Sequence, residues 1–212
     1  MTQGLCLLTI DRPDKANALT ETMLAQLTLA LQQAARDGAR AVILTGTGRV
    51  FSAGADMEQA RTGLATSAEW ERLSGQVAAM PCMTIAALNG TLAGGAFGMA
   101  LACDIRLAVP HAAFFYPVMR LGFLPQPSDP GRLTALVGPA RARMILMAGA
   151  RIAAPEALAW GLVDRICPPE DLMQTARDLA ADCLGADPAH VAAIKALCDH
   201  AAGQAVPLRD GL

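Results

Sequence analysis

Two short stretches of the sequence place a glycine turn soon after an apolar strand, and the backbone amides of such turns can stabilise a developing negative charge. Residues 41–45 predict a strand buried on both faces, and the chain then turns into Ala53-Gly54-Ala55. Residues 84–88 predict a second apolar strand, after which Gly94-Gly95 opens a helix of small residues that ends near Cys103. Amides at a helix start have no acceptor inside the helix, so they can donate to an anion.

Two such turns side by side form an oxyanion hole, which stabilises negative charge on a carbonyl oxygen. The two apolar strands must then be neighbours in one sheet, and the sequence alone leaves this arrangement open. A buried strand and helix with no ligand has the same residue pattern. Both interpretations are therefore kept at this point.

The elements that must position these turns alternate along the first half of the chain. Residues 4–11 predict a strand, and Thr20 predicts the N-cap of a helix that ends near Gly38. Residues 67–80 predict a further helix that leads to Pro81. This alternation is typical of an α/β fold in which helices pack on the sheets.

The chain beyond Pro130 is predicted to be mainly helical. A short strand at 162–166 interrupts this region, and residues 171–184 and 188–202 predict the last two helices. We therefore expect an α/β core over residues 1–150 and a C-terminal helical region over 151–212.

Composition excludes several classes of partner. The chain has 212 residues, 53% of them hydrophobic, which is enough for one sizeable core. Its net charge is −2 and its 17 Lys and Arg residues are dispersed, so no nucleic-acid surface is expected. The uncharged run between Arg72 and Asp104 is interrupted by proline and glycine, so no membrane span is expected.

Cysteine usage and the first residues indicate the compartment. The six cysteines form no CxxC pair and only three histidines accompany them, so we expect no metal site. The sequence MTQGLCLLTIDRP has neither the basic nor the apolar segment of a signal peptide, so we expect a reduced, cytoplasmic protein.

An ordered set of motifs resembles the enoyl-CoA hydratase/isomerase (crotonase) family over about residues 7–200. The motifs are Ile10-Asp11-Arg12-Pro13, Asn17-Ala18-Leu19, FSAGAD from Phe51, Leu88-Asn89-Gly90 with Gly94-Gly95, Leu101-Ala102-Cys103-Asp104-Ile105, Leu121-Gly122 with Pro125, and ALAWGLVD from Ala157. The resemblance implies a ClpP/crotonase-type spiral of ββα units, with a C-terminal helical region that is shortened here. It also implies a homotrimer or hexamer.

The resemblance further implies an acyl-CoA thioester substrate, with coenzyme A as part of the substrate and no separate cofactor. The N–H groups of Ala55 and Gly95 would bind the thioester oxygen and stabilise an enolate-like intermediate. The loop from Ala53 through Asp56 to Met57 would border the adenine. Lys15 is expected either near the coenzyme A phosphates or in solvent.

The positions that carry catalytic carboxylates in the family are substituted here. Hydratases of the family have glutamates where this sequence has Gly98 and Val118, and an isomerase subgroup has an aspartate where it has Gln126. Acid–base chemistry needs a titratable group near the acyl carbons. The candidates are Asp129, which could instead be a helix N-cap followed by a proline, and Tyr116, which could instead be a packed aromatic residue.

Other charged residues are weaker candidates. Arg120 could bind a carboxylate of the acyl group but is expected in a surface ion pair. Glu58 is expected at the start of a helix, where an acidic residue is favoured in any case. Glu69 and Glu71 are expected on a solvated helix, and His111 is expected in an exposed turn.

Three functions remain open at this level. The first is a hydratase or isomerase that acts on acyl-CoA with an unusual acid or base. The second is a decarboxylase that relies mainly on the oxyanion hole. The third is a protein that binds CoA thioesters without turnover.

Overall fold

Two sheets of mainly parallel strands form the framework of the chain, whose computed structural model describes residues 3–201. The larger sheet has the strand order β1 (Leu5–Ile10), β2 (Ala41–Gly46), β4 (Met83–Leu88), β6 (Ile105–Ala108) and β9 (Arg165–Ile166). The smaller sheet has the order β3 (Val50–Ser52), β5 (Thr91–Ala93), β7 (Ala113–Phe115) and β8 (Ile152–Ala153). Only the pairing of β7 with β8 is antiparallel.

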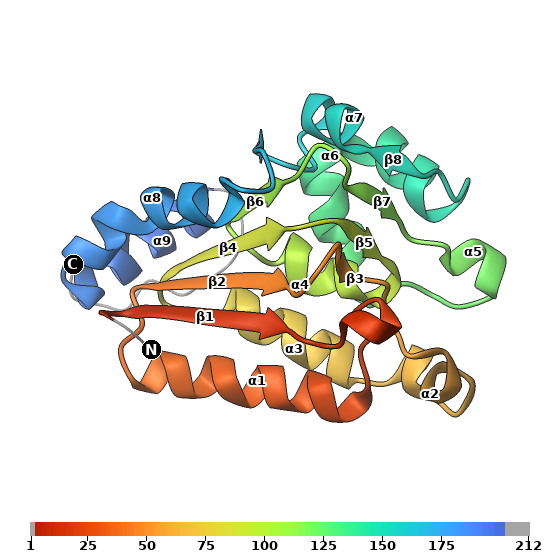
Figure 1. Ribbon diagram of the computed structural model, residues 1–212, viewed down its shortest axis with the longest axis horizontal. Coiled ribbons are helices and arrows are strands. Elements are labelled where there is room, and N and C mark those ends of the chain that lie inside the picture. The colour runs from red at the N-terminus through yellow and green to blue at the C-terminus, as the bar shows by residue number, and fades with distance from the viewer. Residues whose placement is uncertain (1–2, 202–212) are drawn as a thin grey trace.

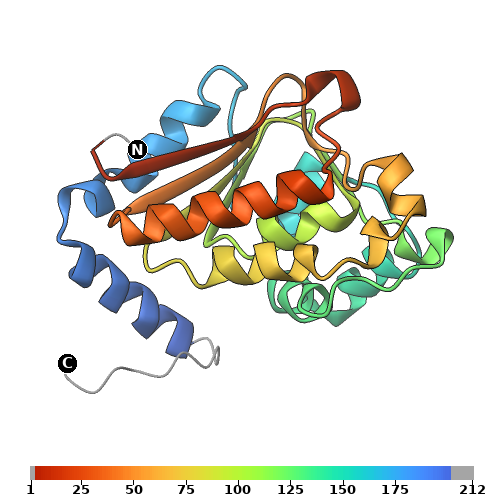
Figure 2. The same ribbon diagram turned by 90° about the horizontal axis from the view of Figure 1, so that it is seen from below.

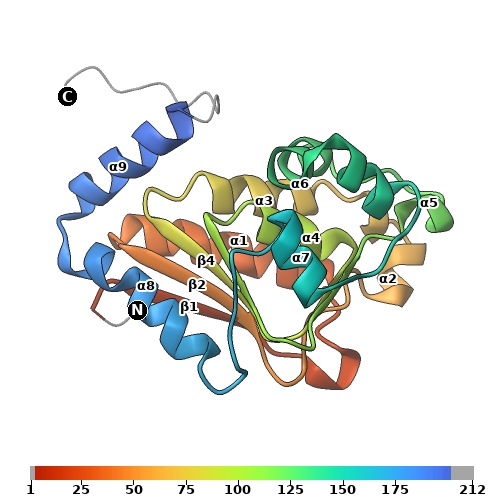
Figure 3. The same ribbon diagram turned by 90° about the horizontal axis from the view of Figure 1, so that it is seen from above.

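The central strands of the larger sheet read as unbroken apolar runs because helices cover both of their faces. Strand β2 pairs with β4 in parallel, from Ala41 opposite Met83 to Leu44 opposite Ala86. Helices α1 (Glu21–Arg36) and α3 (Glu69–Ala78) lie on one face of this sheet, and α8 (Leu172–Gly185) lies on the other (Figures 1, 2 and 3). The two apolar strands, whose arrangement the sequence leaves open, are therefore neighbours in the larger sheet.

The chain repeats one unit three times, in which a long strand is followed by a short strand and a short helix. The units are β2-β3-α2 (α2, Met57–Arg61), β4-β5-α4 (α4, Phe97–Leu101) and β6-β7-α5 (α5, Val118–Leu121). Each long strand joins the larger sheet and each short strand joins the smaller one. The α/β fold built from ββα units is therefore confirmed.

The remaining helices follow the third unit. They are α6 (Asp129–Leu146), α7 (Ala154–Trp160) and α9 (Pro188–Ala201), and short 3₁₀ turns occur at η1 (Pro13–Lys15), η2 (Leu64–Thr66) and η3 (Gly94–Ala96). Helix α6 is bent at Gly138, whose φ of 80° and ψ of 163° break the helical geometry between two straight parts.

Several boundaries differ from the prediction. The helix expected from Gly94 to Cys103 is split into η3 and α4, and the strand expected over 162–166 is reduced to β9. The sequence did not predict the smaller sheet, because its strands have only two or three residues. The last residue of the predicted helix 188–202 lies outside the described residues.

The last helix has few contacts with the rest of the chain. Figure 3 shows α9 extending away from the sheets, and Val191 is its only buried residue. Lys195 anchors α9, because its ammonium donates to the Cys82 carbonyl at 3.0 Å and to Asp104 at 2.9 Å. Among the described residues, every helix is too short or too polar to cross a bilayer.

A buried asparagine ties the first strand to the turn after β2. Asn17 has no exposed surface and adopts a left-handed backbone conformation with a φ of 54°. Its amide group donates to the Thr47 and Val50 carbonyls at 3.0 and 2.7 Å and accepts from the Arg12 N–H at 2.8 Å. Its own carbonyl accepts from the Ser52 hydroxyl at 2.8 Å.

We therefore predict that Asn17→Ala lowers the free energy of unfolding by about 2–4 kcal/mol, because it leaves buried backbone groups without partners. Urea denaturation measures the change. The matched control is Gln33→Ala, which removes an exposed side-chain hydrogen bond to Asp37 and should change stability by less than about 0.5 kcal/mol. A loss of under about 1 kcal/mol in Asn17→Ala would contradict this account.

Candidate active site

The two glycine turns lie against one another. Strand β3 pairs in parallel with β5, and this pairing brings the residues that follow Ser52 next to those that follow Leu92. A Cβ atom at Gly54 would lie 2.8 Å from the Ala93 carbonyl oxygen and 3.3 Å from the Gly94 Cα. Gly54 also has a φ of 93°, so glycine is required here both for space and for backbone conformation.

The peptide group of Ala55 is held from both sides. The Leu19 N–H donates to the Gly54 carbonyl and the Leu19 carbonyl accepts from the Asp56 N–H, each at 2.8 Å. These bonds leave the Ala55 N–H with no backbone acceptor in residues 3–201. Gly95 is the second residue of η3, so its N–H precedes the first acceptor of that helical turn.

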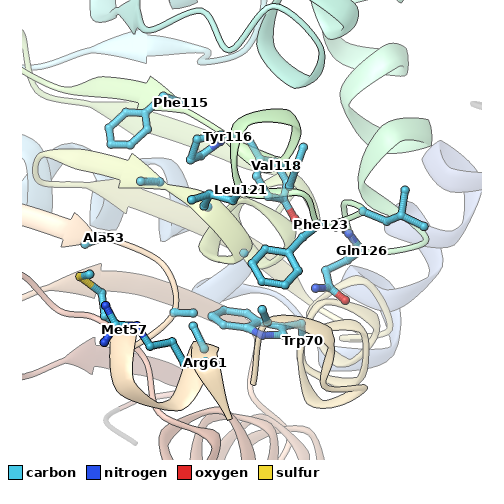
Figure 4. Close-up of a pocket in the computed structure, with 18 residues that line it drawn as sticks. Ala53, Met57, Arg61, Trp70, Phe115, Tyr116, Val118, Leu121, Phe123 and Gln126 are labelled. Carbon is cyan, nitrogen blue, oxygen red and sulfur yellow. Dashed lines mark hydrogen bonds between the residues drawn. The ribbon is translucent and has the colours of Figure 1, made fainter. Parts of the chain in front are cut away.

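Ala55 and Gly95 both line a cavity of about 440 Å³ whose other lining residues are mainly apolar. In Figure 4, Phe115, Tyr116, Val118, Leu121 and Phe123 lie along one side, and Met57, Arg61 and Trp70 lie along the other. The backbone of both turns, from Ala53 to Ala55 and from Ala93 to Gly95, contributes to the lining. Arg61 is the only charged side chain among the described residues that line it.

A buried tryptophan supports the second turn. A Cβ atom at Gly95 would lie 3.0 Å from the Trp70 ring, so the indole packs closely against this glycine. The Trp70 Nε1–H donates to the Leu64 carbonyl at 2.8 Å, which fixes the orientation of the ring. Nothing in the sequence motifs identifies Trp70 as part of this site.

Tyr116 and Asp129 form a hydrogen-bonded pair at the cavity. The Tyr116 hydroxyl lies 2.9 Å from the Asp129 Oδ2, to which it donates. Tyr116 lines the cavity, whereas Asp129 lies behind it with no exposed surface. The second carboxylate oxygen, Oδ1, has no partner in the described part of the chain.

Burial raises the pKa of Asp129 to about 6, because the ionised carboxylate loses hydration. The Tyr116 hydrogen bond and the nearby Arg132 act in the opposite direction, while the negative charge of Glu71 adds to the increase. The pKa of Tyr116 is also raised, first by burial and then by the adjacent carboxylate. The phenol therefore stays protonated at neutral pH and can act as a donor.

The carboxyl group of Asp129 occupies the space beside Gly98. A Cβ atom at Gly98 would lie 2.9 Å from the Asp129 Oδ1 and 3.4 Å from the Ser74 Cβ. The other two substituted positions, Val118 and Gln126, both line the cavity with side chains that cannot titrate. A carboxylate carried by α6 therefore lies next to a position of α4 where the sequence has none.

The structure corrects two expectations about this region. Ser128, and not Asp129, is the N-cap residue of α6, although its side chain makes no capping hydrogen bond, and Asp129 is the first helical residue. Glu71 does not lie on a solvated face, because its carboxylate accepts from the Ser128 N–H at 3.1 Å and from the Ser128 hydroxyl. No sequence motif signals this contact, since Glu71 and Ser128 are far apart in the chain.

Two of the four residues expected to border coenzyme A line the cavity, and two do not. Ala53 and Met57 line the cavity, and Lys15 is exposed in η1 away from the lining. Asp56 caps α2 and pairs with Arg12 at 2.7 Å, and this hydrogen bond holds the pKa of Asp56 below its usual value.

The weaker candidates lie away from the cavity lining. Arg120, Glu58 and His111 are exposed, and Glu69 pairs with Arg72 on α3.

The raised pKa of Asp129 predicts a pH-dependent cost to stability. The folded carboxyl holds its proton up to about pH 6, whereas the unfolded one releases it near 3.8, so the free energy of unfolding falls as pH rises through this window. Asp129→Asn removes the charge and keeps an acceptor for Tyr116. We expect it to stabilise the protein at pH 8 by up to about 3 kcal/mol relative to its effect at pH 4.

Thermal unfolding of both proteins at several pH values measures this difference. A carboxylate that merely capped α6 at the surface would instead give a small effect that does not favour asparagine at high pH.

The chain is similar to known proteins over most of its length. A family model for enoyl-CoA hydratase/isomerase matches residues 1–208. A carnitinyl-CoA dehydratase of Salmonella arizonae is 37% identical over 200 residues, which cover 89% of this chain and 74% of that protein.

Solved structures show the same likeness. An enoyl-CoA hydratase subunit of Geobacillus kaustophilus is 34% identical with a TM-score of 0.85, over 94% of this chain and 79% of that one. An enoyl-CoA hydratase of Mycobacterium avium subsp. paratuberculosis is 31% identical with a TM-score of 0.86, over 95% and 83% of the two chains. These matches confirm the crotonase-type fold. The chain therefore belongs to the enoyl-CoA hydratase/isomerase family of enzymes.

Proposed function

We propose that the chain processes acyl-CoA thioesters through an enolate-like intermediate whose oxygen is bound by the N–H groups of Ala55 and Gly95. The observation that carries this proposal is the meeting of the two glycine turns at the wall of an apolar cavity. Two backbone donors fixed in advance stabilise charge that develops on a carbonyl oxygen, and they do not have to reorganise during the reaction.

The proton transfers are assigned to Tyr116 and Asp129 acting together. The Tyr116 phenol lines the cavity and Asp129 lies behind it at hydrogen-bond distance. A proton leaving the acyl C2 passes to the phenol oxygen as the phenol proton passes to the carboxylate. The reverse transfer then delivers a proton to C4, so one pair of residues can move a double bond without water.

Double-bond migration is therefore favoured over hydration. Hydration requires groups that hold and activate a water molecule, and neither Gly98 nor Val118 can do so. The three positions 98, 118 and 126 provide only a glycine, an apolar residue and an amide. Migration requires only the enolate and a group that exchanges one proton.

The acyl group of the substrate is proposed to be apolar and uncharged. The lining has no carboxylate that could neutralise a cationic group such as the trimethylammonium of a carnitinyl thioester. The Arg61 guanidinium is available to the phosphates of coenzyme A, with Ala53 and Met57 beside the adenine. The trimeric or hexameric assembly and the cytoplasmic location stay predictions from the sequence.

The first experiment incubates the purified protein with a 3-enoyl-CoA, crotonyl-CoA and methylmalonyl-CoA. Products are separated by chromatography and identified by mass spectrometry, while calorimetry measures binding of each thioester. We expect conversion of the 3-enoyl-CoA to its 2-enoyl isomer. Hydration of crotonyl-CoA would show that the protein is a hydratase and not an isomerase, and released CO₂ would favour the decarboxylase. Tight binding without product would contradict an enzymatic role for the site.

We predict that Gly95→Pro lowers turnover at least about 100-fold relative to Gly95→Ala, because only proline removes the donor amide. Both variants add a Cβ atom that would lie 3.0 Å from the Trp70 ring, so they share the steric cost of that atom. The comparison of the two isolates the N–H group, and melting temperatures verify that both are folded. Equal turnover in the two variants would remove Gly95 from the oxyanion hole.

A further inference from the structure

Helix α3 contacts both parts of the proposed machinery through two adjacent residues. The Trp70 ring packs against Gly95, and Glu71 binds Ser128 at the start of α6. The Glu71 carboxylate accepts from both the N–H and the hydroxyl of Ser128. Asp129 follows directly, so Glu71 fixes the point from which this carboxyl group enters the protein interior.

The charged and titratable groups around Asp129 come from three elements. Tyr116 follows β7 and donates to the carboxylate, Arg132 lies one turn further along α6, and Glu71 comes from α3. The Arg132 Nη1 is buried without a partner in the described residues, so no hydrogen bond joins that nitrogen to Asp129. The contacts at Gly98 and Ser74 bring no charge.

We propose that Glu71 is a positioning residue that, through its two hydrogen bonds with Ser128, holds the start of α6 in place and keeps its own negative charge near the Asp129 carboxyl group. The proposal rests on the function assigned above to Tyr116 and Asp129. Glu71 does not line the cavity and touches no reacting atom. It acts through Asp129 alone.

The direction of the effect follows from electrostatics. A negative charge near a carboxyl group disfavours the second negative charge, so Glu71 makes Asp129 hold its proton to higher pH. Arg132 and the Tyr116 hydroxyl favour the ionised form and oppose this effect. Without Glu71, these two groups face only the cost of burial, and Asp129 ionises at lower pH.

The chain contains a single tyrosine, which makes this effect directly measurable. Tyrosine labelled with ¹³C at the Cζ atom gives one NMR signal, and that signal comes from Tyr116. Its chemical shift depends on whether Asp129 accepts a hydrogen bond as a carboxylate or carries a proton. A pH titration of the full chain therefore reports the protonation of Asp129 without any need for turnover.

We expect the midpoint of this titration to lie near pH 6 in the native protein, where the Asp129 pKa is about 6. Glu71→Gln keeps one of the two oxygens that accept from Ser128 and loses the charge, and it should lower the midpoint measurably. Glu71→Asp keeps the negative charge, so its midpoint should lie closer to the native one than that of Glu71→Gln. Asp129→Asn should abolish the step and so identify the titrating group.

The matched control is Glu69→Gln, which removes the same charge from the same helix. Glu69 pairs with Arg72 and does not contact Ser128, so its removal should leave the midpoint unchanged. A midpoint that stays fixed in Glu71→Gln, or that moves equally in both variants, would overturn the proposal. If Glu71→Gln does not fold, Glu71→Asp provides the test. Because this variant keeps the negative charge, a midpoint that departs from the native one would overturn the proposal.

Measurements of turnover distinguish a failure of this proposal from a failure of the function assigned to Tyr116 and Asp129. If the native protein converts its substrate, the acid limb of the pH–rate profile in Glu71→Gln should move with the NMR midpoint. A purely structural role would lower the rate without moving that limb. If the NMR midpoint moves but no substrate is converted, the coupling of Glu71 to Asp129 stands and the assigned function fails.

Discussion

The close approach of the Gly54 and Gly94 backbones is the contact on which the rest of the site depends. It exists because the short strands β3 and β5 pair in parallel directly after the two most deeply buried strands of the larger sheet. Backbone this close leaves no room for a Cβ atom at Gly54. The register of β3 against β5 and the glycine at position 54 therefore depend on each other.

The second constraint is the cost of burying a carboxyl group. Asp129 is fully enclosed, and only one of its two oxygens has a partner in the described residues. A structural carboxylate is normally paired or hydrogen-bonded at both oxygens, because desolvation is expensive. An incompletely satisfied carboxyl group next to a substrate-sized cavity is more typical of a functional group than of a stabilising one.

Much of this architecture can be derived from the sequence because it depends on local patterns. The unbroken apolar run of β2, the Thr20 cap of α1 and the glycine turn at Gly94-Gly95 each follow from the types of neighbouring residues. The smaller sheet could not be derived in this way, since strands of two or three residues carry no periodicity. The contacts of Trp70 and Glu71 were also hidden, because they join residues that only tertiary packing brings together.

The misassigned cap shows the same limit more sharply. Ser128-Asp129-Pro130 contains two residues that can cap a helix, and local preference does not choose between them. In the structure Ser128 is bound by Glu71 from a different helix, and Asp129 is bound by Tyr116 in the interior.

The absence of a side chain at Gly98 has a consequence for how such a site can change over generations. A carboxylate on α4 at this position and the carboxylate of Asp129 on α6 compete for one volume, since even a single carbon at residue 98 would lie 2.9 Å from the Asp129 oxygen. The two arrangements are alternatives and not additions. If one carboxylate is exchanged for the other by single substitutions, the intermediate protein has either both carboxylates crowded together or neither of them. We therefore expect such an exchange to be rare and hard to reverse.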